Sequence, residues 1–232
     1  MCAVPAKAGR QHAVKDPQRR ESTMIQNMNK VHKMTLTAIL AAIIFLLAFT
    51  PLGYLSIGPI AATTVQMPVI IGAALMGPTT GAVLGFFFGL SAIVKVLTMP
   101  GADAFATAAL AYGPLQYLIV CIGARIAMGW LSGLLAVGLR KLPFIKNPNN
   151  VAVYGITGAA GALMNTVFYL GLLWLLCAQV ISTQYGIDLS GVGEFVMGTA
   201  VAAGIPEAIA SCVLVTAVCK ALTRVMRRQV AL

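Results

Sequence analysis

Charged side chains are scarce in this chain of 232 residues: they make up 9% of it, and only six residues are acidic. Hydrophobic residues make up 59%, and the mean hydropathy is +0.89. A water-soluble globular domain carries roughly a quarter charged residues, so the composition excludes one. The sequence therefore predicts an integral membrane protein.

Residues that commonly carry catalytic or metal chemistry are also few. The two histidines, His12 and His32, both precede the first long apolar segment, and the five cysteines form no CxxC pair. The chain contains no P-loop, HExxH or GxSxG motif. We therefore expect no catalytic residue, no metal and no cofactor, and we interpret the cysteines as small apolar side chains.

Six apolar segments approach or exceed the roughly 20 residues that cross a bilayer as a helix. They are continuous, unlike the alternating strands of a barrel, and a helix satisfies its own backbone hydrogen bonds in lipid. The second segment is short and contains Pro68. The sequence predicts an all-α membrane protein, a six-transmembrane-helix bundle whose spans cover residues 34–52, 60–77, 79–98, 113–139, 151–178 and 194–220.

Basic residues are gathered at three places that six spans would put on one side of the membrane. Seven precede the first span, three follow the fourth, and four lie at the end of the sixth span or after it. The positive-inside rule makes this side cytoplasmic, with both termini there. Anionic lipid headgroups account for the net charge of +10, so no nucleic-acid partner is needed. The predicted organisation is a flexible basic arm (1–30), a membrane domain (31–222) and a basic tail (223–232).

Three polar side chains interrupt the later spans at one depth. Arg125, Asn165 and Glu207 each lie roughly 20 to 22 Å along a helix from the cytoplasmic end of their span. Ionisable groups at this depth are costly and often mark a ligand site or a pathway. One interpretation is an Arg125–Glu207 ion pair, with Asn165 beside it, that only stabilises the bundle; the other is contact with a ligand. The two can coexist.

Two further residues belong to the candidate site. Tyr169 shares a helical face with Asn165 because it lies four residues further along. Lys95 lies near the outer end of the third span, where it either extends to the headgroups or turns inward as a second cation that favours an anionic ligand. The outward connections are rich in Gly, Pro, Ser and Thr, which suits loops that cover a pocket.

Small residues recur every four positions in two of the spans. Ala38 and Ala42 do so in the first span, and Gly81, Gly85 and Gly89 do so in the third. Such faces allow close helix packing, either within the bundle or against another membrane subunit. Spacing alone does not choose between these two kinds of partner.

Four stretches between residues 34 and 222 together carry a family resemblance: GYLSIGPIAATTVQMPVIIGAALMGPTTGAVLGFFFGL, ARIAMGWLSGLL, GALMNTVFYLG and GTAVAAGIPEAIAS. Their order and spacing resemble the substrate-binding membrane subunits, or S components, of energy-coupling factor (ECF) vitamin transporters. The resemblance implies a six-helix domain in a prokaryotic plasma membrane that captures a vitamin from outside and topples to release it inside. It also implies a transmembrane coupling subunit, which would bind at Ala38 and Ala42, and two ATPase subunits.

Within that family the chain is most similar to pantothenate-type members. This likeness implies that Arg125 holds a carboxylate, while Asn165, Glu207 and Tyr169 serve hydroxyl and amide groups. The stretch TVQMP departs from the more hydrophobic or histidine-bearing sequence that the family leads us to expect. Other vitamins, such as folate or riboflavin, stay open, as does a self-contained secondary transporter. A membrane-embedded enzyme is disfavoured because the spans contain no histidine.

Overall fold

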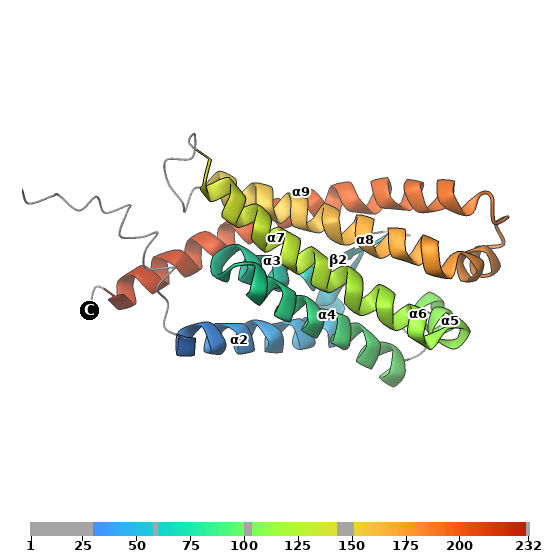
Figure 1. The fold of residues 1–232 in the computed structure, drawn as a ribbon, viewed down its shortest axis with the longest axis horizontal. Helices are drawn as coiled ribbons and strands as arrows, with labels where there is room; N and C mark the ends of the chain where they lie inside the picture. Colours follow the sequence, from blue (N-terminus) through green and yellow to red (C-terminus); the bar gives the residue numbers. More distant parts are fainter. Residues whose placement is uncertain (1–29, 58–59, 100–103, 143–150, 231–232) are drawn as a thin grey trace, which may run out of the picture.

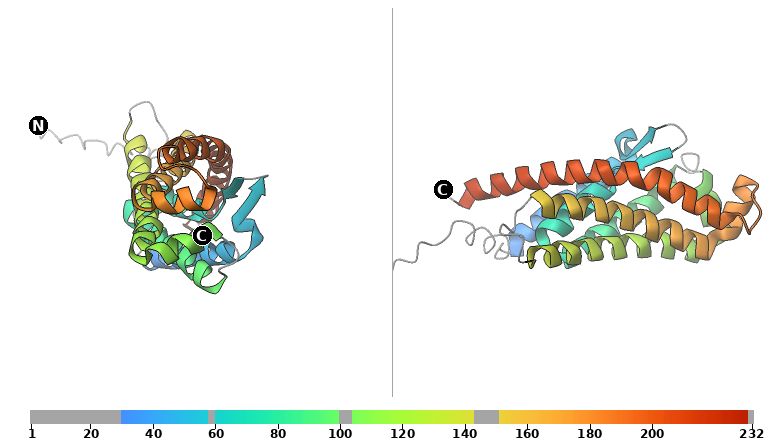
Figure 2. Two further views of the ribbon diagram at one scale, coloured as in Figure 1. Left: turned by 90° about the vertical axis from the view of Figure 1, so that its right-hand side faces the viewer. Right: turned by 90° about the horizontal axis from the view of Figure 1, so that it is seen from above.

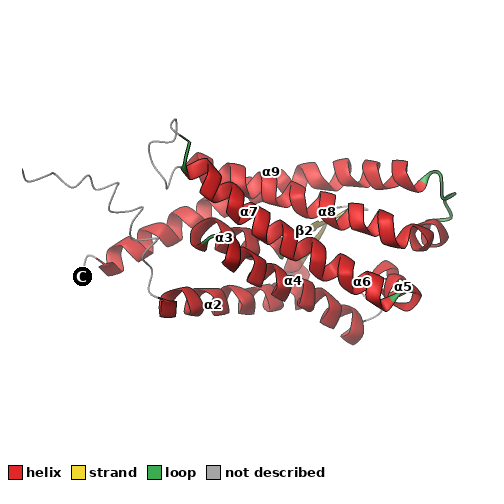
Figure 3. Cartoon of the chain, in the orientation of Figure 1, coloured by secondary structure: helices red, strands yellow, loops and turns green. Residues whose placement is uncertain are grey.

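The protein is an elongated bundle of helices in a computed structural model that describes residues 30–57, 60–99, 104–142 and 151–230 (Figure 1). The helices are α2 (Lys30–Phe49), α3 (Gln66–Met76), α4 (Pro78–Thr98), α5 (Ala104–Tyr112), α6 (Pro114–Leu118), α7 (Ala124–Arg140), α8 (Val151–Tyr185) and α9 (Val192–Val230). A short turn, η1 (Pro51–Gly53), and two strands, β1 (Tyr54–Ile57) and β2 (Ile60–Thr63), connect α2 to α3 (Figure 3). A π-helical turn, η3 (Ile119–Gly123), joins α6 to α7.

Five helical segments are long and apolar enough to cross a membrane. Large apolar side chains stand exposed along their outer faces, as expected where lipid replaces water as the solvent. These segments confirm five of the six predicted spans, and α8 continues beyond the predicted end at residue 178 after a kink at Cys177. They are Lys30–Phe49, Pro78–Thr98, Pro114–Arg140, Val151–Tyr185 and Val192–Val225.

The predicted span 60–77 was wrong as a single helix. Its first residues form β2, which pairs antiparallel with β1, and its remainder forms α3, which has 11 residues. At about 1.5 Å per residue α3 is roughly half the thickness of the hydrocarbon layer. Every residue from Gln66 to Leu75 is buried by the surrounding helices. Because a helix enclosed by protein is as apolar as one that faces lipid, composition alone could not separate the two.

The glycines of α4 form a close contact with α7 inside the bundle. A Cβ atom placed at Gly81 would lie 2.1 Å from the carbonyl oxygen of Gly129, and one at Gly85 would lie 2.2 Å from that of Arg125. Any side chain at these positions would force the two helices apart. The repeat at Gly81, Gly85 and Gly89 therefore serves internal packing.

The repeated small residues of α2 face outward from the bundle, unlike the glycines of α4. Its buried face carries Leu40, Ile44 and Ala48, which pack into the core. Ala38 and Ala42 are exposed on the outer surface of the bundle. The two small-residue repeats that looked alike in the sequence thus occupy different environments.

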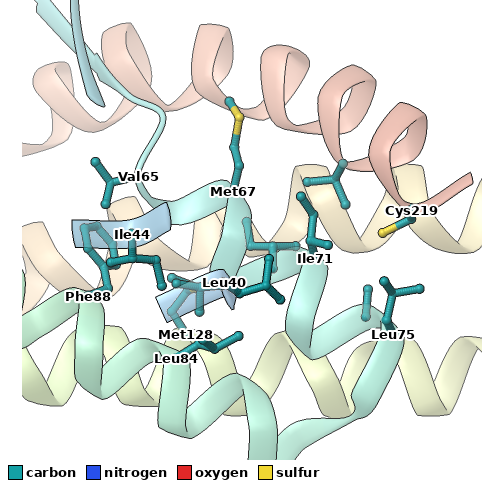
Figure 4. Close-up of a cluster of buried hydrophobic side chains, with 14 of the residues drawn as sticks. Leu40, Ile44, Val65, Met67, Ile71, Leu75, Leu84, Phe88, Met128 and Cys219 are labelled. Carbon is teal, nitrogen blue, oxygen red and sulfur yellow. The ribbon is translucent and has the colours of Figure 1, made fainter. Parts of the chain in front are cut away.

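The core between α2, α3 and α4 consists of interlocking aliphatic and aromatic side chains. Figure 4 shows α3 at its centre, with α2 and α4 close by and α9 behind. Residues labelled there include Leu40, Ile44, Ile71, Leu75, Leu84, Phe88, Met128 and Cys219. This core fixes α3 in place, and with it the residues at the start of that helix.

One end of the bundle gathers the basic residues. The start of α2, the end of α7, the start of α8 and the end of α9 all lie there (Figure 1). Arg140, Lys141, Lys220 and Arg224 belong to these segments. The predicted arm falls outside the described residues except for Lys30, whereas the predicted tail continues helix α9 as far as Val230. The β1–β2 hairpin projects from one flank, beside α9 (Figure 2).

Candidate functional site

The Glu207 carboxylate is buried within α9 and bonded on several sides. Oε1 accepts a hydrogen bond from the backbone N–H of Thr63 at 2.6 Å. Oε2 accepts from Nε2 of Gln66 at 3.4 Å and from Oγ1 of Thr166 at 3.3 Å. Donors on the hairpin, α3 and α8 therefore compensate the cost of placing this carboxylate in the membrane interior.

The same contacts hold the β1–β2 hairpin against the bundle. Thr63 is the last residue of β2, so its bond to Glu207 ties the strand directly to α9. Among the described residues Glu207 bonds to these three groups and makes no ion pair with Arg125. The ion pair considered from the sequence does not form in this structure.

Arg125 lies in the first turn of α7, directly after the π-helical turn. Its Nη1 donates to the carbonyl oxygen of Cys121 at 3.0 Å. A π-turn displaces the regular hydrogen-bond ladder, and such turns are frequent at functional sites. The side chain of Arg125 thus folds back along the irregular turn and is 8% exposed.

Two aromatic rings lie against the Arg125 guanidinium. Its Cζ lies 4.5 Å from the ring centre of Phe88 in α4 and 4.9 Å from that of Tyr169 in α8. Stacking on aromatic faces stabilises a guanidinium and leaves its edge, where the N–H donors lie, directed sideways. A planar, charged fork held in this way is suited to a carboxylate.

Asn165 lies one helical turn from Tyr169, toward the basic end of the bundle. Its side chain is 8% exposed, and among the described residues its Oδ1 has no hydrogen-bond partner. Along α8, about 6 Å separates Asn165 from Tyr169. The structure therefore places Arg125 against Tyr169, one turn along α8 from Asn165, and it joins Glu207 to Thr166, the neighbour of Asn165.

Lys95 lies in the last turn of α4 and is half-buried. It follows Phe88 by seven residues, so both lie on nearly the same face of α4, with Lys95 about two turns further from the basic end. This is the face that meets Arg125.

Sequence reasoning missed three members of this network, namely Thr63, Gln66 and Thr166. All three donate to Glu207 from segments far away in the sequence. Gln66 carried a signal, since it is a polar residue in an otherwise apolar segment. It lies in the TVQMP stretch that departed from the expected family pattern.

The arrangement defines a multi-pass helical membrane protein with polar and charged side chains enclosed between its helices. A family model described as "ECF transporter, substrate-specific component" matches residues 32–219. The chain belongs to this family, whose members are transporter subunits rather than enzymes.

Two curated proteins are similar over most of the chain. One is the "Pantothenate transporter PanT" of Leuconostoc mesenteroides subsp. mesenteroides, 28% identical over 86% of this chain and 96% of that protein. The other is the "Pantothenic acid transporter PanT" of Lactococcus lactis subsp. cremoris, 28% identical over 72% of this chain and 80% of that protein.

Proposed function

We propose that the chain is the substrate-capture subunit of an ATP-driven ECF importer and that it binds pantothenate from outside the cell. The observation that carries the proposal is the buried Arg125, whose guanidinium lies against Phe88 and Tyr169, with the buried Asn165 one turn along α8 from Tyr169. A site of this kind pairs one fixed cation with polar groups that lie deeper in the bundle. The names of the two similar transporters support the choice of vitamin.

Pantothenate has the complementary chemistry: a carboxylate at one end, two hydroxyls at the other, and an amide between them. Arg125 binds the carboxylate, and Lys95 adds a second positive charge toward the outer side. Tyr169 and Asn165 contact the amide and hydroxyl groups. Glu207 acts mainly by holding Gln66 and the hairpin in position, since its carboxylate is already occupied by their N–H donors.

The proposal includes partners and an orientation. The enclosed α3, together with the five long helices, makes six membrane segments. The basic end of the bundle faces the cytoplasm of a prokaryotic cell. Because the sequence has no P-loop, two separate ATPase subunits supply the energy, through a transmembrane coupling subunit that topples this chain in the membrane. The exposed Ala38 and Ala42 of α2 allow close approach of that subunit.

A ligand screen tests the proposed vitamin. Purified chain is heated with pantothenate, folate, riboflavin and other water-soluble vitamins, and positive shifts in Tm are followed by calorimetry. We expect pantothenate to raise the Tm most and to bind one-to-one without turnover. A larger Tm shift with another vitamin would identify that vitamin as the ligand instead of pantothenate. Uptake into vesicles that contain this chain alone would identify a self-contained carrier.

Substitution of Ala38 tests the partner surface. Ala38→Trp places a bulky ring on the exposed face of α2, so we expect it to block assembly with the coupling subunit while ligand binding persists. The matched control is Ala202→Trp, which makes the same change at an exposed position of α9. Co-purification measures assembly, and normal assembly of the Ala38 variant would count against this interface.

A further inference from the structure

Gln66 is a fully buried amide in contact with the carboxylate of Glu207. It is 0% exposed at the start of α3, and its Nε2 donates to Oε2 of Glu207. In the structure the amide nitrogen faces the Glu207 carboxylate, which accepts its hydrogen bond, and the amide oxygen lies on the other side of the side chain. Among the described residues that oxygen, Oε1, has no hydrogen-bond partner.

The packing of α3 against α8 places Asn165 at the level of Gln66. A Cβ atom at Gly161 of α8 would lie 2.9 Å from the side chain of Ile70 in α3, so these two positions face each other. The two helices run in opposite directions: α3 ends near Arg140, which donates to the carbonyl oxygen of Ala74, whereas α8 begins at that end of the bundle.

Moving one turn away from that end leads from Ile70 to Gln66 and from Gly161 to Asn165. Two buried amide oxygens, each without a described partner, therefore occupy one level of the α3–α8 interface. Leaving such acceptors unbonded in a membrane interior is costly. A buried serine or threonine hydroxyl without a partner can rotate and donate to a helix carbonyl. An amide oxygen can only accept a hydrogen bond, so it requires a donor from elsewhere.

We propose that Gln66 is a specificity-determining residue, whose Oε1 accepts a hydrogen bond from a ligand hydroxyl beside Asn165. This inference rests on the proposed function and deepens it. The anionic end of the ligand is at Arg125, and the hydroxyl-bearing end lies about one helical turn deeper, at the two amide oxygens. The site thereby selects small acids that carry donor groups at the end remote from the carboxylate.

The test compares pantothenate with its dideoxy analogue, in which hydrogen replaces both hydroxyls while the carboxylate and the amide remain. Calorimetry on the purified full chain measures both affinities. We expect wild type to prefer pantothenate by at least about a hundredfold, because a site built to bond hydroxyls rejects a ligand that lacks them. Equal affinities in wild type would overturn the role of Gln66.

Variants assign the preference to Gln66. Gln66→Met keeps the length of the side chain without its acceptor, so we expect pantothenate to bind at least about tenfold more weakly and the analogue to bind unchanged. Gln66→Asn keeps an amide beside Glu207, but its shorter side chain moves the amide oxygen away from the ligand hydroxyl. We therefore expect this variant also to lose the preference for pantothenate over the analogue. Gln116→Met, the same change in α6, is the control and should behave as wild type.

Two results separate this inference from the function on which it rests. If wild type binds neither compound, the proposed function fails. If wild type prefers pantothenate but Gln66→Met and Gln66→Asn both retain that preference, or weaken both ligands equally, only the role of Gln66 fails.

Discussion

At the scale of single residues, Glu207 shows how a carboxylate is accommodated in a membrane bundle. Three donors from the hairpin, α3 and α8 surround it, so its charge is paired with N–H and O–H dipoles rather than with a cation. The sequence could identify Glu207, Arg125 and Asn165 as candidates because polar residues stand out in apolar spans. It could not identify their partners, since those contacts join positions up to 144 residues apart.

Neutralising Glu207 should loosen the hairpin. Glu207→Gln replaces one acceptor oxygen by an NH₂ group, which cannot accept hydrogen bonds from the neighbouring donors. We therefore expect a loss of about 1–3 kcal/mol in stability and faster hydrogen exchange at the Thr63 amide. Exchange followed by mass spectrometry measures the second effect. Glu194→Gln, at an exposed position in the first turn of α9, is the control. Unchanged protection of Thr63 would refute the link between the hairpin and α9.

At the scale of elements, hydropathy predicted the long helices because lipid imposes one length and one composition on them. It did not predict the hairpin or the short α3, whose residues are as apolar as a span but are enclosed by other helices. The π-turn before Arg125 was also missed, since nothing in Ile119–Gly123 distinguishes it from a regular helix. The alanine and glycine repeats looked alike in sequence, and only the packing showed which one faces inward.

The contact of α4 with α7 can be tested at Gly85. Gly85→Ala places a methyl carbon 2.2 Å from the Arg125 carbonyl oxygen, so the helices must separate. We expect a cost of about 1–3 kcal/mol and weaker ligand binding because Arg125 moves with its backbone. Gly171→Ala in α8 has open space and should be neutral or slightly stabilising, because alanine favours a helix. Equal Tm values for the two variants would contradict this packing.

At the scale of the whole molecule, the basic residues at one end of the bundle set the expected orientation. Lys141 lies after α7 at that end, whereas Leu189 lies between α8 and α9 at the opposite end. Both are exposed. Because α8 is the one candidate span between them, these two positions lie on opposite sides of the membrane if α8 crosses it.

Cysteine labelling tests that topology in intact cells. In a background whose native cysteines are replaced by alanine, we expect a membrane-impermeant maleimide to label Leu189→Cys directly. We expect Lys141→Cys to react only after the membrane is permeabilised. The opposite pattern would invert the orientation, and labelling of both in intact cells would contradict a membrane-crossing α8.

The central claim is that the buried Arg125 receives the carboxylate of a captured small acid. The most direct measurement is calorimetric titration of pantothenate into wild type, Arg125→Ala and the exposed control Arg224→Ala, each first shown to be folded. The account predicts tight binding to wild type and to the Arg224 variant, and a loss of at least about a hundredfold in affinity for the Arg125 variant. Undiminished affinity of a folded Arg125→Ala protein would contradict it.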